Sequence, residues 1–136
     1  MHTVGTFTFE SAADARTEYE SVGPAAQTVV REVAKAMEFD REEYDDRVTS
    51  DVIETARDAL FASLLEVRVG PREEFEDWRD DYDGEVMMAG HEDVDRVVWH
   101  AGPDGQAVAA TFQNEEEAAI ATLRRQAFGR VYRDIV

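Results

Sequence analysis

The chain has 136 residues, a net charge of −17 and no cysteine. Its length suits one domain, and a 43% hydrophobic, 10% aromatic composition excludes intrinsic disorder. The lack of cysteine excludes disulfides and thiol catalysis. No apolar run approaches the length of a membrane helix, and the amino terminus lacks the layout of a signal peptide. We therefore expect one cytoplasmic domain, residues 1–136, that does not bind membranes.

The charge balance is strongly acidic, with 31 Asp and Glu residues against 14 cations, all arginine except Lys35. Such a surface repels itself in dilute buffer, whereas at molar salt the Debye length falls to about 3 Å and the repulsion is screened. The composition therefore predicts a salt-adapted protein. It also argues against nucleic acid as a partner, because that binding needs positive charge.

Helices dominate the predicted first half of the chain. Residues 3–9 alternate apolar and hydroxyl side chains, which is typical of a half-exposed strand. Ser11 caps a predicted helix that runs to about Tyr19, and Pro24 begins another. Apolar residues of this second helix recur at spacings of three and four and predict a single stripe: Ala26, Val29, Val30, Val33 and Met37.

An acidic segment at 38–46 predicts a solvated turn or short helix. Thr49 or Ser50 then caps the helix with the strongest apolar periodicity, which continues to Val67, and we expect it to be the central core helix. Residues 65–69 either close that helix or form a short strand. Gly70 and Pro71 precede another acidic helix, which we expect to dock on the body through three rings: Phe75, Trp78 and Tyr82.

Beyond Glu85, short apolar runs predict strands at 86–88, 94–101 and 107–112. Between the last two, the sequence Gly102-Pro-Asp-Gly105 predicts a type I turn with Gly105 as the left-handed residue of a bulge. Asn114 then caps a long helix, with glutamates at its start and arginines toward its end, as the helix dipole favours. We expect an α+β fold of four to five helices on a small antiparallel sheet, with a hairpin at 94–112.

The sequence identifies no catalytic residue and no cofactor. It contains no phosphate-binding loop, dinucleotide fingerprint, serine elbow or zinc-binding helix motif. Asp81 to Gly84 match inner positions of a calcium loop, but this frame places Arg79 and Gly90 where the loop requires carboxylates. A second cluster supplies four candidate metal ligands: His91, Glu92, Asp93 and Asp95. Because so acidic a chain produces such clusters by composition, a solvated loop is favoured over a metal site.

His100 lies beside Trp99 on the predicted hairpin. The bulged turn pairs Gly102 with Gln106 and places His100 opposite Val108, whereas a two-residue turn would place Trp99 on that face instead. A histidine satisfied by one backbone or carboxylate partner is favoured over a catalytic base.

Residues 122–136 form the one basic stretch, with four arginines and Asp134 giving +3. Helical spacing places Arg124 within the apolar arc, while Arg125, Arg130 and Arg133 scatter around the helix and make no single basic stripe. A partly buried Arg124 requires a carboxylate within the fold, across a dimer interface or on a ligand, and pairing within the fold is favoured.

Two segments carry a resemblance: residues 23–44 (GPAAQTVVREVAKAMEFDREEY) and residues 124–133 (RRQAFGRVYR). They resemble a family of small uncharacterised proteins from halophilic archaea. The resemblance spans most of the chain and implies a salt-adapted, cytoplasmic protein. It implies no activity, cofactor or catalytic residue.

The leading functional hypothesis is a non-catalytic interaction or regulatory module that forms a homodimer. An unidentified protein is a second candidate partner. The missing catalytic motifs and the apolar faces of the two longest helices motivate it. The alternative is a small enzyme or ligand-binding protein in which Arg124 or Arg125 holds an anionic molecule near His100 and Trp99.

Overall fold

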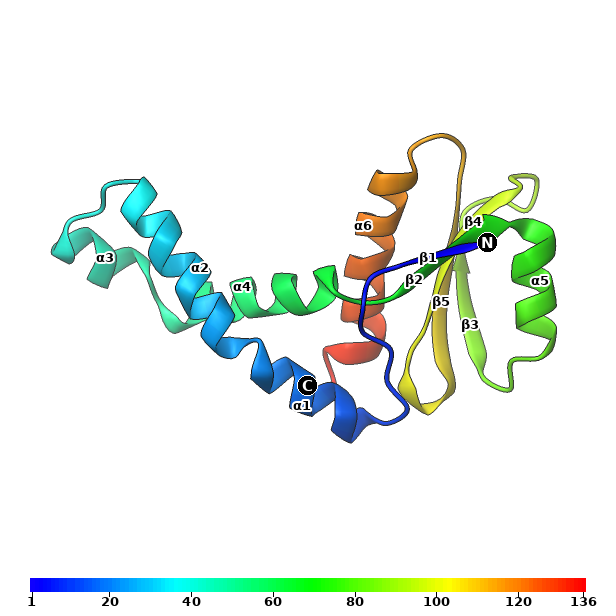
Figure 1. The fold of residues 1–136 in the computed structure, drawn as a ribbon, viewed down its shortest axis with the longest axis horizontal. Helices are drawn as coiled ribbons and strands as arrows, with labels where there is room; N and C mark the ends of the chain where they lie inside the picture. The colour runs from blue at the N-terminus through cyan, green and yellow to red at the C-terminus, as the bar shows by residue number, and fades with distance from the viewer.

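The structure is a computed structural model that describes residues 1–136, and it combines a five-stranded sheet with a helical arm (Figure 1). The strands are β1 (His2–Val4), β2 (Val67–Pro71), β3 (Glu85–Ala89), β4 (Arg96–Ala101) and β5 (Gln106–Phe112). The helices are α1 (Ala12–Ser21), α2 (Gly23–Ala36), α3 (Arg41–Arg47), α4 (Ser50–Ser63), α5 (Arg72–Asp80) and α6 (Glu116–Ala127). A π-helical turn, Phe128–Tyr132, extends α6.

The strand order is β1-β2-β4-β5-β3. All neighbours are antiparallel except β3 and β5, which run parallel. The α+β class is therefore confirmed, and the sheet is mixed rather than wholly antiparallel. The parallel pair arises because β3 precedes β4 in the chain but lies on the far side of β5.

The predicted hairpin is confirmed in its register. His100 lies opposite Val108, and the Gly102 amide donates to the Gln106 carbonyl at 2.8 Å. The turn itself differs from the type I prediction, because Asp104 takes φ 61° and precedes a second left-handed residue, Gly105. Aspartate tolerates this conformation better than most residues do.

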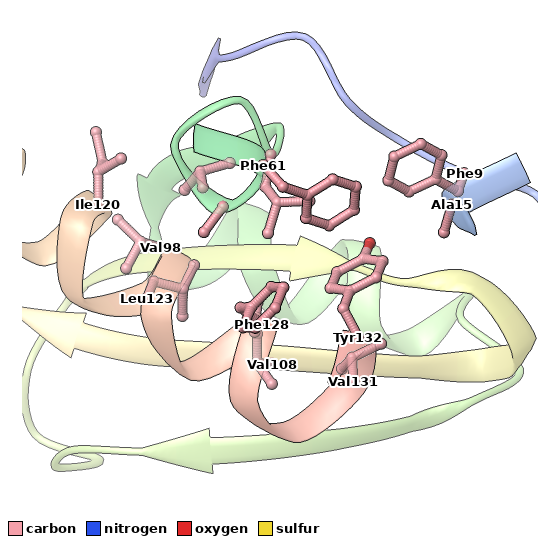
Figure 2. Close-up of a cluster of buried hydrophobic side chains, with 14 of the residues drawn as sticks. Phe9, Ala15, Phe61, Val98, Val108, Ile120, Leu123, Phe128, Val131 and Tyr132 are labelled. Carbon is pink, nitrogen blue, oxygen red and sulfur yellow. The ribbon is translucent and has the colours of Figure 1, made fainter. Parts of the chain in front are cut away.

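The main core lies between α6 with its π-helical turn and the face of β4 and β5 that bears Val98 and Val108 (Figure 2). Phe61, from the end of α4, is fully buried and stacks on Phe9 with ring centroids 5.7 Å apart. The rings of Tyr132 and Phe61 pack edge to face, with centroids 5.3 Å apart. These aromatic contacts join three segments that are far apart in the sequence.

The opposite face of the sheet carries a smaller core. Trp99 is fully buried there against Phe75 of α5, with ring centroids 5.3 Å apart, and Trp78 stacks on Tyr82 at 4.7 Å. The predicted docking of this acidic helix is confirmed for Phe75 and Trp78, whereas Tyr82 lies beyond the end of α5 and stacks on Trp78.

Helices α2, α3 and the first turns of α4 form the arm, which projects away from the sheet (Figure 1). The prediction that α4 is the central core helix is wrong for most of its length, since only Phe61 and Ala62 at its end are buried. The apolar stripe of α2 is also only partly covered. Its buried side chains are mainly small, and α4 covers just one flank of the helix.

The predicted end of the first strand and the predicted start of the last helix differ from the structure. The first strand ends at Val4 rather than Phe9, because Gly5 turns the chain at φ 103° and Phe7 makes only a single bridge to Leu65. Asn114 does not cap α6, which begins at Glu116 without a side-chain cap.

Residues 64–66 join the arm to the sheet and are crossed by the N-terminal segment. The Leu64 carbonyl accepts hydrogen bonds from the amides of Thr6 at 2.9 Å and Phe7 at 2.6 Å. The Glu66 amide donates to the Phe7 carbonyl at 2.8 Å. We call residues 64–66 the connector.

Replacing Gly5 with alanine should destabilise the fold, because a β-carbon there would lie 2.5 Å from the Leu65 carbonyl oxygen at a positive φ. We expect the free energy of unfolding to fall by about 2 kcal/mol or more, measured by denaturant titration in molar KCl. Gly129→Ala is the control, because a β-carbon at Gly129 meets nothing within 4 Å. Equal losses in the two variants would contradict the tight crossing at Gly5.

Candidate functional site

His100 is almost completely buried, with 2% of its surface exposed. Its Nδ1 lies 2.6 Å from the Glu66 carbonyl oxygen, and its Nε2 lies 2.5 Å from the Tyr132 hydroxyl. Because a carbonyl only accepts, Nδ1 carries the proton and donates, and Nε2 of the neutral ring accepts from Tyr132. Both ring nitrogens are therefore occupied by partners within the fold.

The surroundings of His100 favour its neutral form. Burial lowers its pKa to about 4, and the positive charges of Arg124 and Arg68 act in the same direction. Burial also raises the pKa of the Tyr132 hydroxyl above its ordinary value. Neither group is set up to exchange protons with a substrate near neutral pH.

Arg124 is half-buried beside the connector, as the sequence predicted, but its partners are backbone carbonyls rather than a carboxylate. Its Nε donates to Leu65 at 3.0 Å and its Nη2 to Val4 at 3.4 Å. Arg124 and His100 thus bind adjacent carbonyls of the connector. They lie close together and hold the arm, the sheet and α6 in place.

The other two residues of the predicted anion site lie elsewhere. Trp99 faces the opposite side of the sheet from His100, within the smaller core, and its indole nitrogen is buried without a partner. Arg125 is exposed on α6, and its Nη2 donates to Thr122 at 3.3 Å. The structure therefore brings Arg124 and His100 together and leaves Trp99 and Arg125 apart from them.

The acidic cluster at 91–95 remains a solvated loop. His91 Nδ1 lies 3.6 Å from a carboxylate oxygen of Asp93, with both side chains mostly exposed. Glu92 and Asp95 are exposed as well. No three histidine, aspartate or glutamate side chains in the structure are grouped so that they could hold a metal ion.

The arm carries most of the exposed large apolar side chains of the molecule. Four large apolar side chains are exposed there: Val29 by 43%, Val33 by 52%, Met37 by 58% and Val52 by 42%. We call these four residues the arm patch. The sequence carried a signal for it, since the apolar arc of α2 is wider than one neighbouring helix can cover, but periodicity alone does not say which flank stays exposed.

The chain belongs to a family of unknown function (DUF5809), whose model matches residues 6–133. No curated protein and no solved structure matches the chain. None of its helices combines the length and apolar character that a membrane span requires.

An NMR titration of the His100 ring should show no protonation until the pH approaches about 4, against 6.5 for a free histidine. The unfolded chain takes up this proton first, so the stability due to neutral His100 is complete above pH 6.5 and declines as the pH falls toward about 4. The loss amounts to about 3 kcal/mol. Titration of the folded protein near pH 6.5 would contradict the buried network.

Arg124→Met should lower the free energy of unfolding by about 1–3 kcal/mol, because the Leu65 and Val4 carbonyls lose their donors. Arg125→Met removes the same charge from an exposed site and should leave stability nearly unchanged. Denaturant titrations of both variants in molar KCl make the comparison. An Arg124 variant as stable as the Arg125 variant would show that Arg124 does not hold the connector.

Proposed function

We propose that the protein is a non-catalytic interaction module of a salt-adapted cytoplasm, and that its arm pairs with a second copy to form a homodimer. The observation that carries this proposal is the arm patch. Of the seven exposed large hydrophobic residues in the chain, four belong to it. Exposed apolar side chains that gather on one surface are typical of protein interfaces.

The arm has little core of its own. The side chains that α2 buries are small or β-branched: Ala26, Val30 and Ala34. None of them belongs to either of the two hydrophobic clusters of the body. A partner that covers the arm patch would therefore supply apolar burial that the arm lacks as a monomer.

The spacing of the arm patch suits a second copy. Val29, Val33 and Met37 are each four residues apart and form one row along α2. Two such rows packed antiparallel about Val33 bring Val29 of one copy against Met37 of the other, which is the self-complementary contact of a two-fold dimer.

The charges of α2 permit the same occupant at high salt. Glu32 and Lys35 pair with each other at 3.3 Å. The −17 charge of each copy opposes association in dilute buffer, and molar salt screens this repulsion.

The anion-binding alternative has less support. Both nitrogens of His100 and two of the three guanidinium nitrogens of Arg124 already bind groups of the fold. An anion at this position would have to compete with the bonds that hold the connector.

Light scattering or sedimentation in molar KCl should give the mass of a dimer, and dilution into low salt should shift it toward the monomer. Val33→Glu places a charge in the arm patch and should weaken the dimer by about tenfold or more. Thr28→Glu adds the same charge on another flank of α2 and should leave the dimer intact. A monomeric wild-type protein in molar KCl, or equal effects of the two variants, would contradict the proposal.

A further inference from the structure

Strand β3 forms an open edge of the sheet. It pairs with β5 on one side and has no strand on the other. Proteins commonly blunt such edges with short strands, prolines or charges. The opposite edge follows this rule, because β1 has only three residues. Strand β3 has five residues, no proline and a single charge, Glu85, at its start.

Helix α6 packs over β4 and β5 rather than over β3. A groove lies between β3 and α6. In Figure 2 the buried side chains gather above β4 and β5, and the strand at the lower margin lies outside them. The groove has a volume of about 290 Å³. Its lining residues are Met87, Met88, Ala89, Val108, Gln126 and Arg130.

The chemistry of the groove combines an adaptable apolar floor with one positive charge. Met87 is 37% exposed, and flexible methionine side chains adapt to varied partners. Arg130 is exposed and forms no ion pair within the chain.

This groove differs in charge from four other cavities of comparable size on the surface. Each of those is lined by at least one aspartate or glutamate, whereas this one has none. In a chain of net charge −17, an acid-free groove bearing a free arginine favours an acidic occupant.

We propose that the β3 edge and its groove bind an extended acidic peptide segment of another protein, which adds to the sheet as a sixth strand. The free backbone groups of β3 supply main-chain hydrogen bonds. Side chains of an added strand alternate between its two faces, so every second residue faces the groove, where an apolar side chain lies over Met87 and a carboxylate two residues away reaches Arg130. This surface is separate from the arm patch, so the two proposals are tested independently.

The probe is a short peptide of the repeat threonine-valine-threonine-aspartate, which places valine and aspartate in turn on one face of a strand; it is titrated into the isotope-labelled full chain in molar KCl and followed by backbone NMR. We expect shifts at residues 85–89 and around Arg130. Arg130→Glu should weaken binding by about tenfold. Arg125→Glu makes the same charge change on α6 outside the groove and should leave the affinity within about twofold. The same peptide with lysine in place of aspartate should bind the wild-type chain more weakly.

Strand addition is tested with the unaltered protein and two N-methylated peptides, one methylated at the odd residues and one at the even residues. In one of them the amides that face β3 are blocked, and this peptide should not bind. The other keeps those amides and should bind. Equal binding of the two methylated peptides would overturn strand addition. The proposal also fails if the peptide does not bind, if shifts map to the arm, if both arginine variants weaken binding equally, or if β3 is already paired with a second copy.

Discussion

The connector, residues 64–66, is the constraint on which the rest of the structure depends. Its carbonyls accept hydrogen bonds from the N-terminal segment at Leu64, from Arg124 of α6 at Leu65 and from His100 of β4 at Glu66. Backbone groups buried without partners are costly, so each of these donors is needed where the chain passes from α4 into β2. Phe61 packs directly before it at the centre of the main core.

This arrangement explains why His100 and Arg124, the candidate site residues of the sequence, have structural roles. The neutral ring of His100 accepts a hydrogen bond from Tyr132 and donates one to the connector. Arg124 donates to two backbone carbonyls. The two surfaces that we propose for partners lie at opposite ends of the molecule: the apolar arm patch, and the groove beside β3 with its single positive charge (Figure 1). The connector lies between them in the chain.

Local signals in the sequence predicted local features well. The Gly102 to Gly105 turn set the hairpin register, and so the face on which His100 lies, because a hairpin is fixed by its own loop. The partners of His100 were not predictable, since Glu66 and Tyr132 are 34 and 32 residues away. The parallel pairing of β3 and the exposure of the α2 stripe likewise depend on what packs alongside, which periodicity does not encode.

Hydrogen exchange in molar KCl at low and high protein concentration tests the central claim most directly, because it reports separately on the arm and the body. The account predicts that amides of α2 around Val33 exchange more slowly at high concentration, while β2, β4 and the connector are strongly protected at both concentrations. Exchange in α2 that does not change with concentration, or a connector that opens together with the arm, would contradict it.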